Sequence, residues 1–284
     1  RRPPRSTLFP YTTLFRSLEL LATDAQTKVV AIVSKPPAPD VQKRVIERAG
    51  AIGKPVVICF LGGDPAASAG NVHRASSLEE TARQAVALAG ARQPGGDEQS
   101  IEALATRVCA SLAPSQRNLR GLYSGGTFCS EAQTIWRAAG LRVRSNAPLA
   151  EADRLADVEA SQGHTAIDLG SDEFTVGRPH PMIDPSVRDD ALRAALKNHD
   201  LSVILLDLVL GYGAHADPAE HLTKIVADRG QDAPVLVASV VGTEQDPQGR
   251  SAQVRKLEQA GFVVAPSNAQ ACELAVAIVQ NAGR

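Results

Sequence analysis

The feature that most constrains the fold is a series of short apolar runs, each followed by an amphipathic stretch. In the C-terminal half, residues 201–211 read LSVILLDLVLG and residues 233–242 read APVLVASVVG. The N-terminal half has comparable runs, KVVAIVS at 28–34 and KPVVICFLG at 54–62. Strands without polar alternation are buried on both faces, which is typical of parallel sheets covered by helices. The pattern therefore predicts the α/β class with doubly wound parallel sheets.

An internal repeat divides this pattern into two copies. Residues 20–33 parallel residues 194–206, and the copies end on matching amphipathic stretches, SSLEETARQAVALAGAR and SNAQACELAVAIVQNAGR. The spacing is far longer than the roughly 20–50 residues of solenoid repeats, so we expect two tandem flavodoxin-like domains. We place the first domain at 18–92, a linker with one helix at 93–118, and the second domain at 119–284.

The stretch TLFPYTTLFRS at residues 7–17 matches neither a helical nor a strand period. A secretory signal needs an unbroken apolar run of about 7–15 residues, and Pro10 and Arg16 interrupt this one. Written back into DNA, the stretch resembles the translated end of a sequencing-library adapter, so we interpret residues 1–17 as an artefactual leader. The second copy has strand and helix patterns ahead of the shared part that the first copy lacks. We therefore expect the first domain to be truncated at its N-terminus.

Composition excludes several classes of function. A net charge of −1 gives no electrostatic reason to expect binding to nucleic acid or to an anionic membrane. No apolar run approaches the roughly 18 residues of a membrane span. The four cysteines lie far apart without metal-ligand spacing, so we expect no metal site and a reducing, cytoplasmic location.

Loops that follow parallel strands carry the ligands in open α/β sheets, and the first such candidate is YSGGTFCSE. Its four residues Ser124, Gly125, Gly126 and Thr127 precede a helix, so free main-chain N–H groups favour a phosphate or other anion. A tight turn with an N-cap residue explains the same sequence. Glu131 follows in the expected first turn of that helix.

The second candidate loop, DLGSDEFTVGRPHPMIDP, mixes both charges with two prolines around a histidine. We assign Asp172, Glu173 and Arg178 to substrate binding and His180 to catalysis. The third, LGYGAHADP, ends a very apolar strand, and Gly211, Gly213 and His215 are its candidates for contacting a phosphate or carboxylate. This third loop lacks the GxGxxG pattern and gives no argument for NAD.

These three motifs together closely resemble the FdrA family of acyl-CoA-synthetase-like proteins and, more distantly, the succinyl-CoA synthetase superfamily. The resemblance covers residues 18–284 and implies chemistry on acyl phosphates and CoA. It also implies that Glu131 matches a glutamate that contacts a phosphohistidine. The resemblance implies CoA or no cofactor, because the family begins with a CoA-binding-like domain that we expect this chain to lack. We expect this fragment to be inactive by itself.

One departure from the superfamily bears on the reaction. The phosphorylated histidine belongs to a GHAGA loop after the strand that corresponds to PVVICFL, and here that loop reads GGDPAASAGNVHR. His73 is near but lacks the flanking glycines, and we interpret it as structural. The alternative is a subunit of an oxamate carbamoyltransferase in purine degradation, which uses carbamoyl phosphate and no phosphohistidine. A second alternative is a non-catalytic scaffold. All three readings imply partner subunits or a homo-oligomer.

Overall fold

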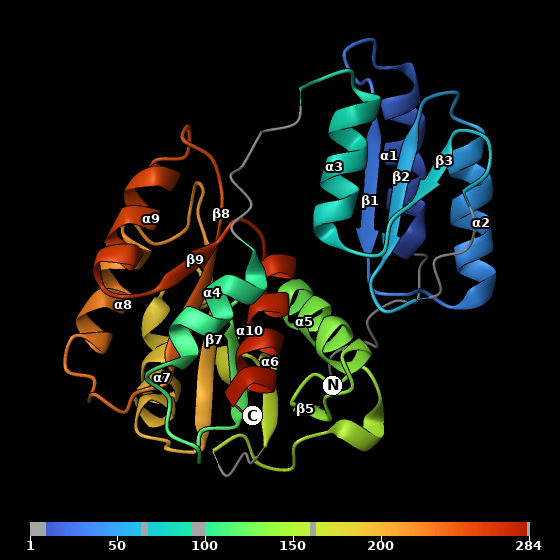
Figure 1. Cartoon of the computed structure of the whole chain (residues 1–284). Helices are drawn as coiled ribbons and strands as arrows, with labels where there is room; N and C mark the ends of the chain where they lie inside the picture. Colours follow the sequence, from blue (N-terminus) through green and yellow to red (C-terminus); the bar gives the residue numbers. More distant parts are fainter. Residues whose placement is uncertain (1–9, 64–67, 93–99, 160–162, 283–284) are drawn as a thin grey trace. The chain divides into compact units, whose positions relative to one another are not determined.

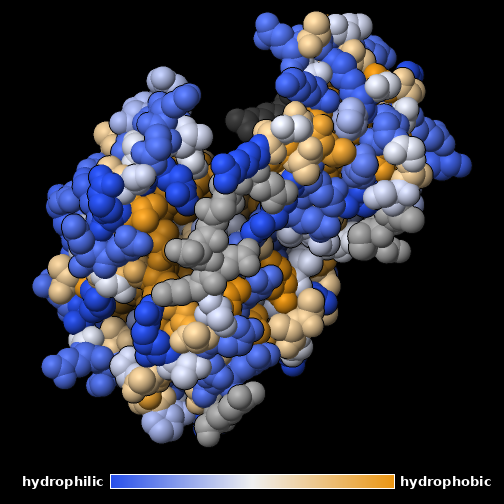
Figure 2. Space-filling model, turned by 45° about the horizontal axis from the view of Figure 1, so that its top comes forward, coloured by the Kyte–Doolittle hydropathy of each residue, from blue (hydrophilic) through white to orange (hydrophobic). Residues whose placement is uncertain are grey.

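The computed structural model describes residues 10–63, 68–92, 100–159 and 163–282, and it divides the chain into two compact units, Arg1–Gly96 and Asp97–Arg284. Each unit has its own parallel sheet with helices on both faces (Figure 1), which confirms the predicted α/β class. In Figure 2 most of the visible surface is hydrophilic, and hydrophobic residues show in patches.

The first unit is a three-stranded parallel sheet. Its elements are α1 (Pro10–Thr23), β1 (Val30–Ser34), α2 (Pro39–Gly50), β2 (Val56–Phe60), β3 (Val72–Arg74) and α3 (Leu78–Leu88), and the strand order is β1-β2-β3. The central strand β2 is buried along its whole length. Along β1 the burial alternates, so that Ala31 and Val33 are exposed.

Helix α1 corrects one expectation from the sequence. Residues 10–17 were expected to have no regular period, but they form the first turns of this helix. Leu14 and Phe15 pack against the core of the first unit together with Leu18 and Leu21, which places apolar side chains on one helical face. Helical packing does not report where a segment came from, so the interpretation of residues 1–17 as an artefact stays a prediction.

The second unit has a six-stranded parallel sheet in the order β5-β6-β4-β7-β8-β9. Its elements are α4 (Ile101–Cys109), β4 (Asn118–Tyr123), α5 (Gly126–Ala138), β5 (Val143–Ser145), η1 (Glu151–Asp153), β6 (His164–Asp168), α6 (Asp172–Thr175), η2 (Pro185–Arg188), α7 (Asp189–Leu196), β7 (Leu201–Val209), α8 (Pro218–Val226), β8 (Val235–Val241), α9 (Arg250–Gln259), β9 (Val263–Ala265) and α10 (Asn268–Ala282). Helices α4, α5 and α10 cover one face of the sheet, and α7, α8 and α9 cover the other (Figure 1).

The helix expected within the linker, α4, packs into the core of the second unit. Ala105 is fully buried there, and the Sγ atom of Cys109 lies 3.5 Å from the carbonyl oxygen of Ile278 in α10. The exposed hydrophobic side chains of this unit include Val176, Ile183 and Tyr212, all on segments that follow β6 or β7.

Candidate functional site

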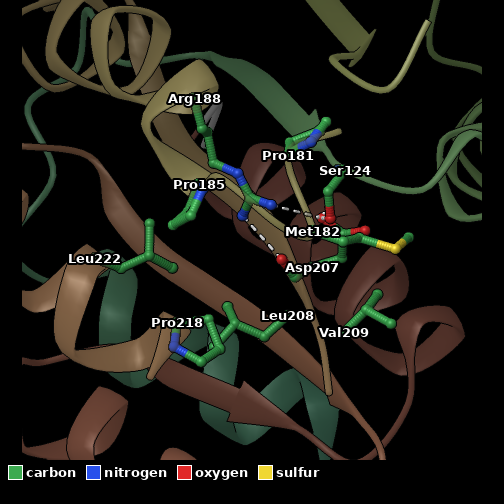
Figure 3. Close-up of a pocket in the computed structure, with 10 residues that line it drawn as sticks. All are labelled: Ser124, Pro181, Met182, Pro185, Arg188, Asp207, Leu208, Val209, Pro218 and Leu222. Atoms are coloured by element: carbon green, nitrogen blue, oxygen red, sulfur yellow. Dashed lines mark hydrogen bonds and ion pairs between the residues drawn. The ribbon is translucent and has the colours of Figure 1, made fainter. Parts of the chain in front are cut away.

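The strand order defines where a ligand site is expected in the second unit. From β4 the chain runs outward to β5 and β6, and it then returns to the other side of β4 for β7, β8 and β9. The carboxyl ends of β4 and β7 thus flank the topological switch point, where open α/β sheets bind ligands. A small pocket lies there, with room for about one water molecule at about 10 Å³ (Figure 3).

A buried carboxylate holds the two sides of the switch point together. Asp207 lies in β7 and is fully buried. Its carboxylate accepts hydrogen bonds from the main-chain N–H of Ser124 (2.7 Å), from the Ser124 hydroxyl (2.9 Å) and from the main-chain N–H of Gly125 (2.9 Å). These three donors satisfy the hydrogen-bonding capacity of a carboxylate that has no access to water. Asp207 therefore fixes the turn between β4 and α5.

Arg188, at the end of η2, is the charge partner of this carboxylate. Its Nη1 donates to the main-chain oxygen of Asp207 (2.8 Å) and its Nη2 to Oδ1 (3.2 Å), as the dashed lines in Figure 3 mark. The side chain is only 5% exposed, and burial lowers the pKa of the guanidinium, an effect that the carboxylates of Asp207 and Asp189 oppose. Its Nε is buried and has no hydrogen-bond partner among the described residues.

Local sequence explains how Arg188 reaches this position. Pro185 begins η2 with its fixed φ, and the Asp184 carboxylate caps the turn by accepting from the Ser186 N–H at 3.1 Å. Donation by the side chain and main chain of Ser186 lowers the pKa of the Asp184 carboxyl. The main-chain oxygen of Met182 also accepts from the N–H of His215, at 2.8 Å. The segment 180–189, hereafter the strap, is thus hydrogen-bonded to the loop after β7.

A further contact pins the far end of the strap. The Nε2 of His221 in α8 lies 2.7 Å from the Asp189 carboxylate, and the His221 ring meets the His215 ring edge to face with centroids 6.0 Å apart. The strap therefore has three independent attachments, through Met182, Arg188 and Asp189.

The loop predicted to bind an anion has its first donors engaged within the protein. Helix α5 begins at Gly126, and the N–H groups of Ser124 and Gly125 already bond to Asp207. A second carboxylate is close, because a Cβ on Gly126 would lie 2.6 Å from the Oδ2 of Asp168. An anion that binds there has to compete with these carboxylates for the positive end of the helix. Anion binding by Ser124–Thr127 stays a prediction.

Glu131 is one full turn into α5 and faces α10, not the loop. It is 1% exposed, and its Oε2 accepts from the Nδ2 of Asn268 at 2.8 Å. Asn268 is the first residue of α10, so the carboxylate also lies near a helix N-terminus. Its catalytic role stays a prediction, and in this conformation the carboxylate contributes to helix packing.

The structure separates the candidates of the second predicted loop. Asp172, Glu173 and Arg178 are exposed, the first two in the short helix α6. His180 is half-buried, and its Nδ1 accepts from the Met182 N–H at 3.3 Å, so its proton is expected on Nε2. A Cβ on Gly170 would lie 2.6 Å from that Nε2 and 2.6 Å from the carbonyl oxygen of Ser124. Of the four, His180 is the candidate that lies beside the switch point.

The third predicted loop uses its glycines for backbone shape. Gly211 and Gly213 have φ of 140° and 84°, values that other residues rarely adopt. The N–H and carbonyl oxygen of Gly211 both bond to the Gln248 side chain. The Nδ1 of His215 accepts from the Asp217 N–H at 3.1 Å, and Asp217 in turn caps α8. His215 is half-buried beside Met182 of the strap, and its contact with a ligand stays a prediction.

Sequence reasoning missed the central pair of the site, Arg188 and Asp207. One signal was present for Asp207, because a single carboxylate inside the nine-residue apolar strand β7 requires a buried partner. No comparable signal marked Arg188, whose burial depends on the path of the strap. Among the described residues, no three His, Cys, Asp or Glu side chains are arranged to hold a metal ion.

The fold and this site define the class of protein: a doubly wound α/β protein with a small pocket at the switch point of its second sheet. The family model described as CoA-ligase matches residues 122–278, and the chain belongs to that family. Protein YahF of Escherichia coli (strain K12), itself described as uncharacterized, is 37% identical over 261 residues, which are 89% of this chain and 50% of YahF.

The solved structures that the chain matches include two enzymes, both at low identity. The dinucleotide-forming acetyl-coenzyme A synthetase 1 of Ca. Korarchaeum cryptofilum, in complex with phosphate and ADP, is 15% identical with a TM-score of 0.44, over 95% of this chain and 56% of that one. The ATP citrate lyase of Methanosaeta concilii is 15% identical with a TM-score of 0.38, over 95% and 37%. The chain thus spans about half the length of the relatives it matches, or less. Among the described residues, no helix has the length and apolar character needed to cross a bilayer.

Proposed function

We propose that the second unit is the acyl-phosphate-handling part of an acyl-CoA-ligase-like protein of the FdrA type. The observation that carries the proposal is the match to the CoA-ligase family over the unit that holds the switch-point crevice. In such a reaction the CoA thiol attacks the acyl carbon, a C–S bond forms, and the C–O bond to phosphate breaks. The leaving phosphate needs cationic or N–H partners, because negative charge builds up on its oxygens.

We assign roles to residues on this basis. Arg178 is exposed next to the strap and is the candidate partner for phosphate or for a substrate carboxylate. His180 carries the proton on Nε2 in its neutral form and can donate it toward the leaving oxygen. Asp207 and Arg188 position the Ser124–Gly125 turn and touch no substrate in this scheme.

CoA is the proposed cofactor, and we place its binding outside the part of the protein that this chain spans. Relatives of about twice the length leave room for such a region. Partner subunits or a homo-oligomer complete the proposed active site. We propose a reducing cytoplasm as the location of the protein.

One observation favours a second candidate function, carbamoyl transfer from carbamoyl phosphate. The only histidine near the position expected for a phosphohistidine, His73, lies in the edge strand β3, where it pairs with Val57 of β2. A histidine held in a strand is poorly placed to move between two active sites as a phosphoryl carrier. Direct transfer needs no such carrier, because the C–O bond to phosphate breaks as the bond to the acceptor nitrogen forms. Oxamate is the proposed acceptor, within a multi-subunit enzyme of purine degradation.

Isothermal titration distinguishes these proposals. The chain and, in parallel, full-length YahF are titrated with CoA, with acetyl phosphate and with carbamoyl phosphate. CoA binding by YahF together with acetyl phosphate binding by both proteins supports the ligase function. Carbamoyl phosphate binding by both, without CoA binding by YahF and weakened by Arg178→Ala in the chain, supports the transferase. If neither protein gives a binding heat with any of the three ligands, both functions are contradicted and a scaffold is favoured.

A further inference from the structure

The switch-point pocket has a mostly apolar wall. Around Ser124, Arg188 and Asp207 it is lined by Pro181, Met182, Pro185, Leu208, Val209, Pro218 and Leu222 (Figure 3). These apolar residues come from three elements that the chain brings together only in the folded state: the strap, the end of β7 and the start of α8. Ser124 in the lining is part of the turn that Asp207 positions, so the pocket lies directly beside that turn.

The charges on this wall cancel each other. Arg188 and Asp207 form an ion pair at 3.2 Å, and the guanidinium also donates to the main-chain oxygen of Asp207. A ligand carboxylate that entered the pocket would lose its water, gain no uncompensated cation, and lie close to the Asp207 carboxylate. Burying a charge under these conditions costs several kcal/mol. The wall therefore selects against a charged group.

The size of the pocket sets a second limit. Its volume of about 10 Å³ suits about one water molecule, and three of its wall residues are prolines with a fixed φ. Met182 is the exception, because its unbranched side chain is half-buried and can change rotamer. This space, together with the movement of the Met182 side chain, makes room for a group of a few heavy atoms.

We propose that this pocket is the acyl subsite and that it takes a small uncharged acyl group, of acetyl or carbamoyl size, in preference to one with a second carboxylate. The inference rests on the proposed acyl-phosphate chemistry and names its substrate class. Acetyl and carbamoyl groups both fit this selection, because each is an uncharged carbonyl group with one small substituent.

The chain carries its own probe of this pocket. Met182 is its single methionine, so protein labelled with ¹³C-methyl methionine gives one internal NMR signal, from the pocket wall. A methionine added at the N-terminus for expression gives a separate signal. Acetyl phosphate, carbamoyl phosphate, inorganic phosphate and succinate are titrated separately. We expect saturable shifts of the Met182 signal with one or both acyl phosphates, and none with phosphate or succinate.

Two variants that narrow the pocket complete the experiment. Leu222→Phe fills it from α8, and Val209→Ile adds one methylene at a less buried position in case the larger change disturbs folding. Each is expected to weaken the Met182 response by about tenfold or more. Leu20→Phe, at a 70% exposed position of the first unit, is the matched control and should change nothing.

The outcomes separate this proposal from the function on which it rests. Succinate shifting Met182 as strongly as acetyl phosphate overturns the proposed selectivity. Acyl phosphates that bind by titration calorimetry without moving Met182, or whose binding survives both variants, place the acyl group elsewhere and leave the proposed function standing. Acyl phosphates that do not bind at all contradict the proposed function itself. A response to acetyl phosphate but not to carbamoyl phosphate, or the reverse, identifies which of the two groups the pocket takes.

Discussion

Replacing Arg188 by alanine is the perturbation that tests the centre of the second unit most directly. The change removes two hydrogen bonds, to the main-chain oxygen and to Oδ1 of Asp207. It also leaves the Asp207 carboxylate buried without its cation, although the Ser124 and Gly125 donors remain. Removing one member of a buried pair costs about 3–5 kcal/mol. Since three donors stay in place, we expect a value near the lower end, about 3 kcal/mol.

Urea unfolding followed by tryptophan fluorescence measures this loss in the correct unit. Trp136 is the single tryptophan of the chain, it is fully buried, and it lies in α5 of the second unit. With a urea dependence of about 2 kcal/mol per M, a loss of about 3 kcal/mol lowers the unfolding midpoint by about 1.5 M. Exchanging both partners for apolar residues, Arg188→Met with Asp207→Leu, should cost less than Arg188→Ala plus Asp207→Ala, because no charge is left unpaired.

The matched control for this experiment is Arg193→Ala. Arg193 also pairs with a carboxylate, that of Asp189 at 3.4 Å, but its side chain is 52% exposed. Pairs of this kind contribute about 0–1 kcal/mol. Equal losses for Arg188→Ala and Arg193→Ala would refute the reasoning, since they would mean that water reaches the Arg188–Asp207 pair as freely as it reaches the surface.

Three more predictions follow from the structure. Gly170→Ala should destabilise the second unit by about 1–3 kcal/mol, because its Cβ would collide with the His180 imidazole and the main-chain oxygen of Ser124. The control Gly230→Ala has open space around its Cβ and should not destabilise the unit; urea unfolding followed by fluorescence measures both variants. Burial lowers the pKa of His164, so its unfolded form binds more protons below about pH 6.5. The free energy of unfolding of the second unit should therefore fall as pH decreases from 6.5 toward the pKa of folded His164. His164→Gln should remove that part of the pH dependence, measured by urea unfolding at several pH values. The same pH dependence in the variant and the original protein would contradict this prediction. Val33→Lys, on the exposed face of edge strand β1, should reduce self-association at high protein concentration, measured by light scattering, without unfolding the first unit. Equal scattering from the variant and the original protein would mean that β1 does not mediate self-association.

The parallel strands could be read from the sequence because burial on both faces leaves a continuous apolar run. The nine residues of β7 and the seven of β8 are of this kind. The three-residue strands β3 and β5 could not be read in this way, since a run so short is set by its neighbours in the sheet. The helical state of residues 10–17 was also missed, because it depends on packing against the first unit.

The bonding of the candidate site could not be predicted from the sequence. Strand-to-helix loops indicated the carboxyl edge of the sheet, and the structure places His180, Ser124 and Gly125 beside the switch point there, while their roles in binding and catalysis stay predictions. What those loops bond to is a matter of tertiary structure. Asp207 meets Ser124 across 83 positions of sequence, and no local pattern near either residue encodes that contact.

The packing of α4 against α10 has a consequence for the order in which the protein is made. Residues 101–109 leave the ribosome well before residues 268–282, which form the helix that completes their burial. Trp136 donates to the main-chain oxygen of Cys272 at 3.1 Å and therefore also depends on that helix. The first unit contains all of its own described core and can fold while synthesis continues. The second unit cannot close its core until residues 268–282 have been made, so its apolar sheet face needs protection from aggregation during that interval.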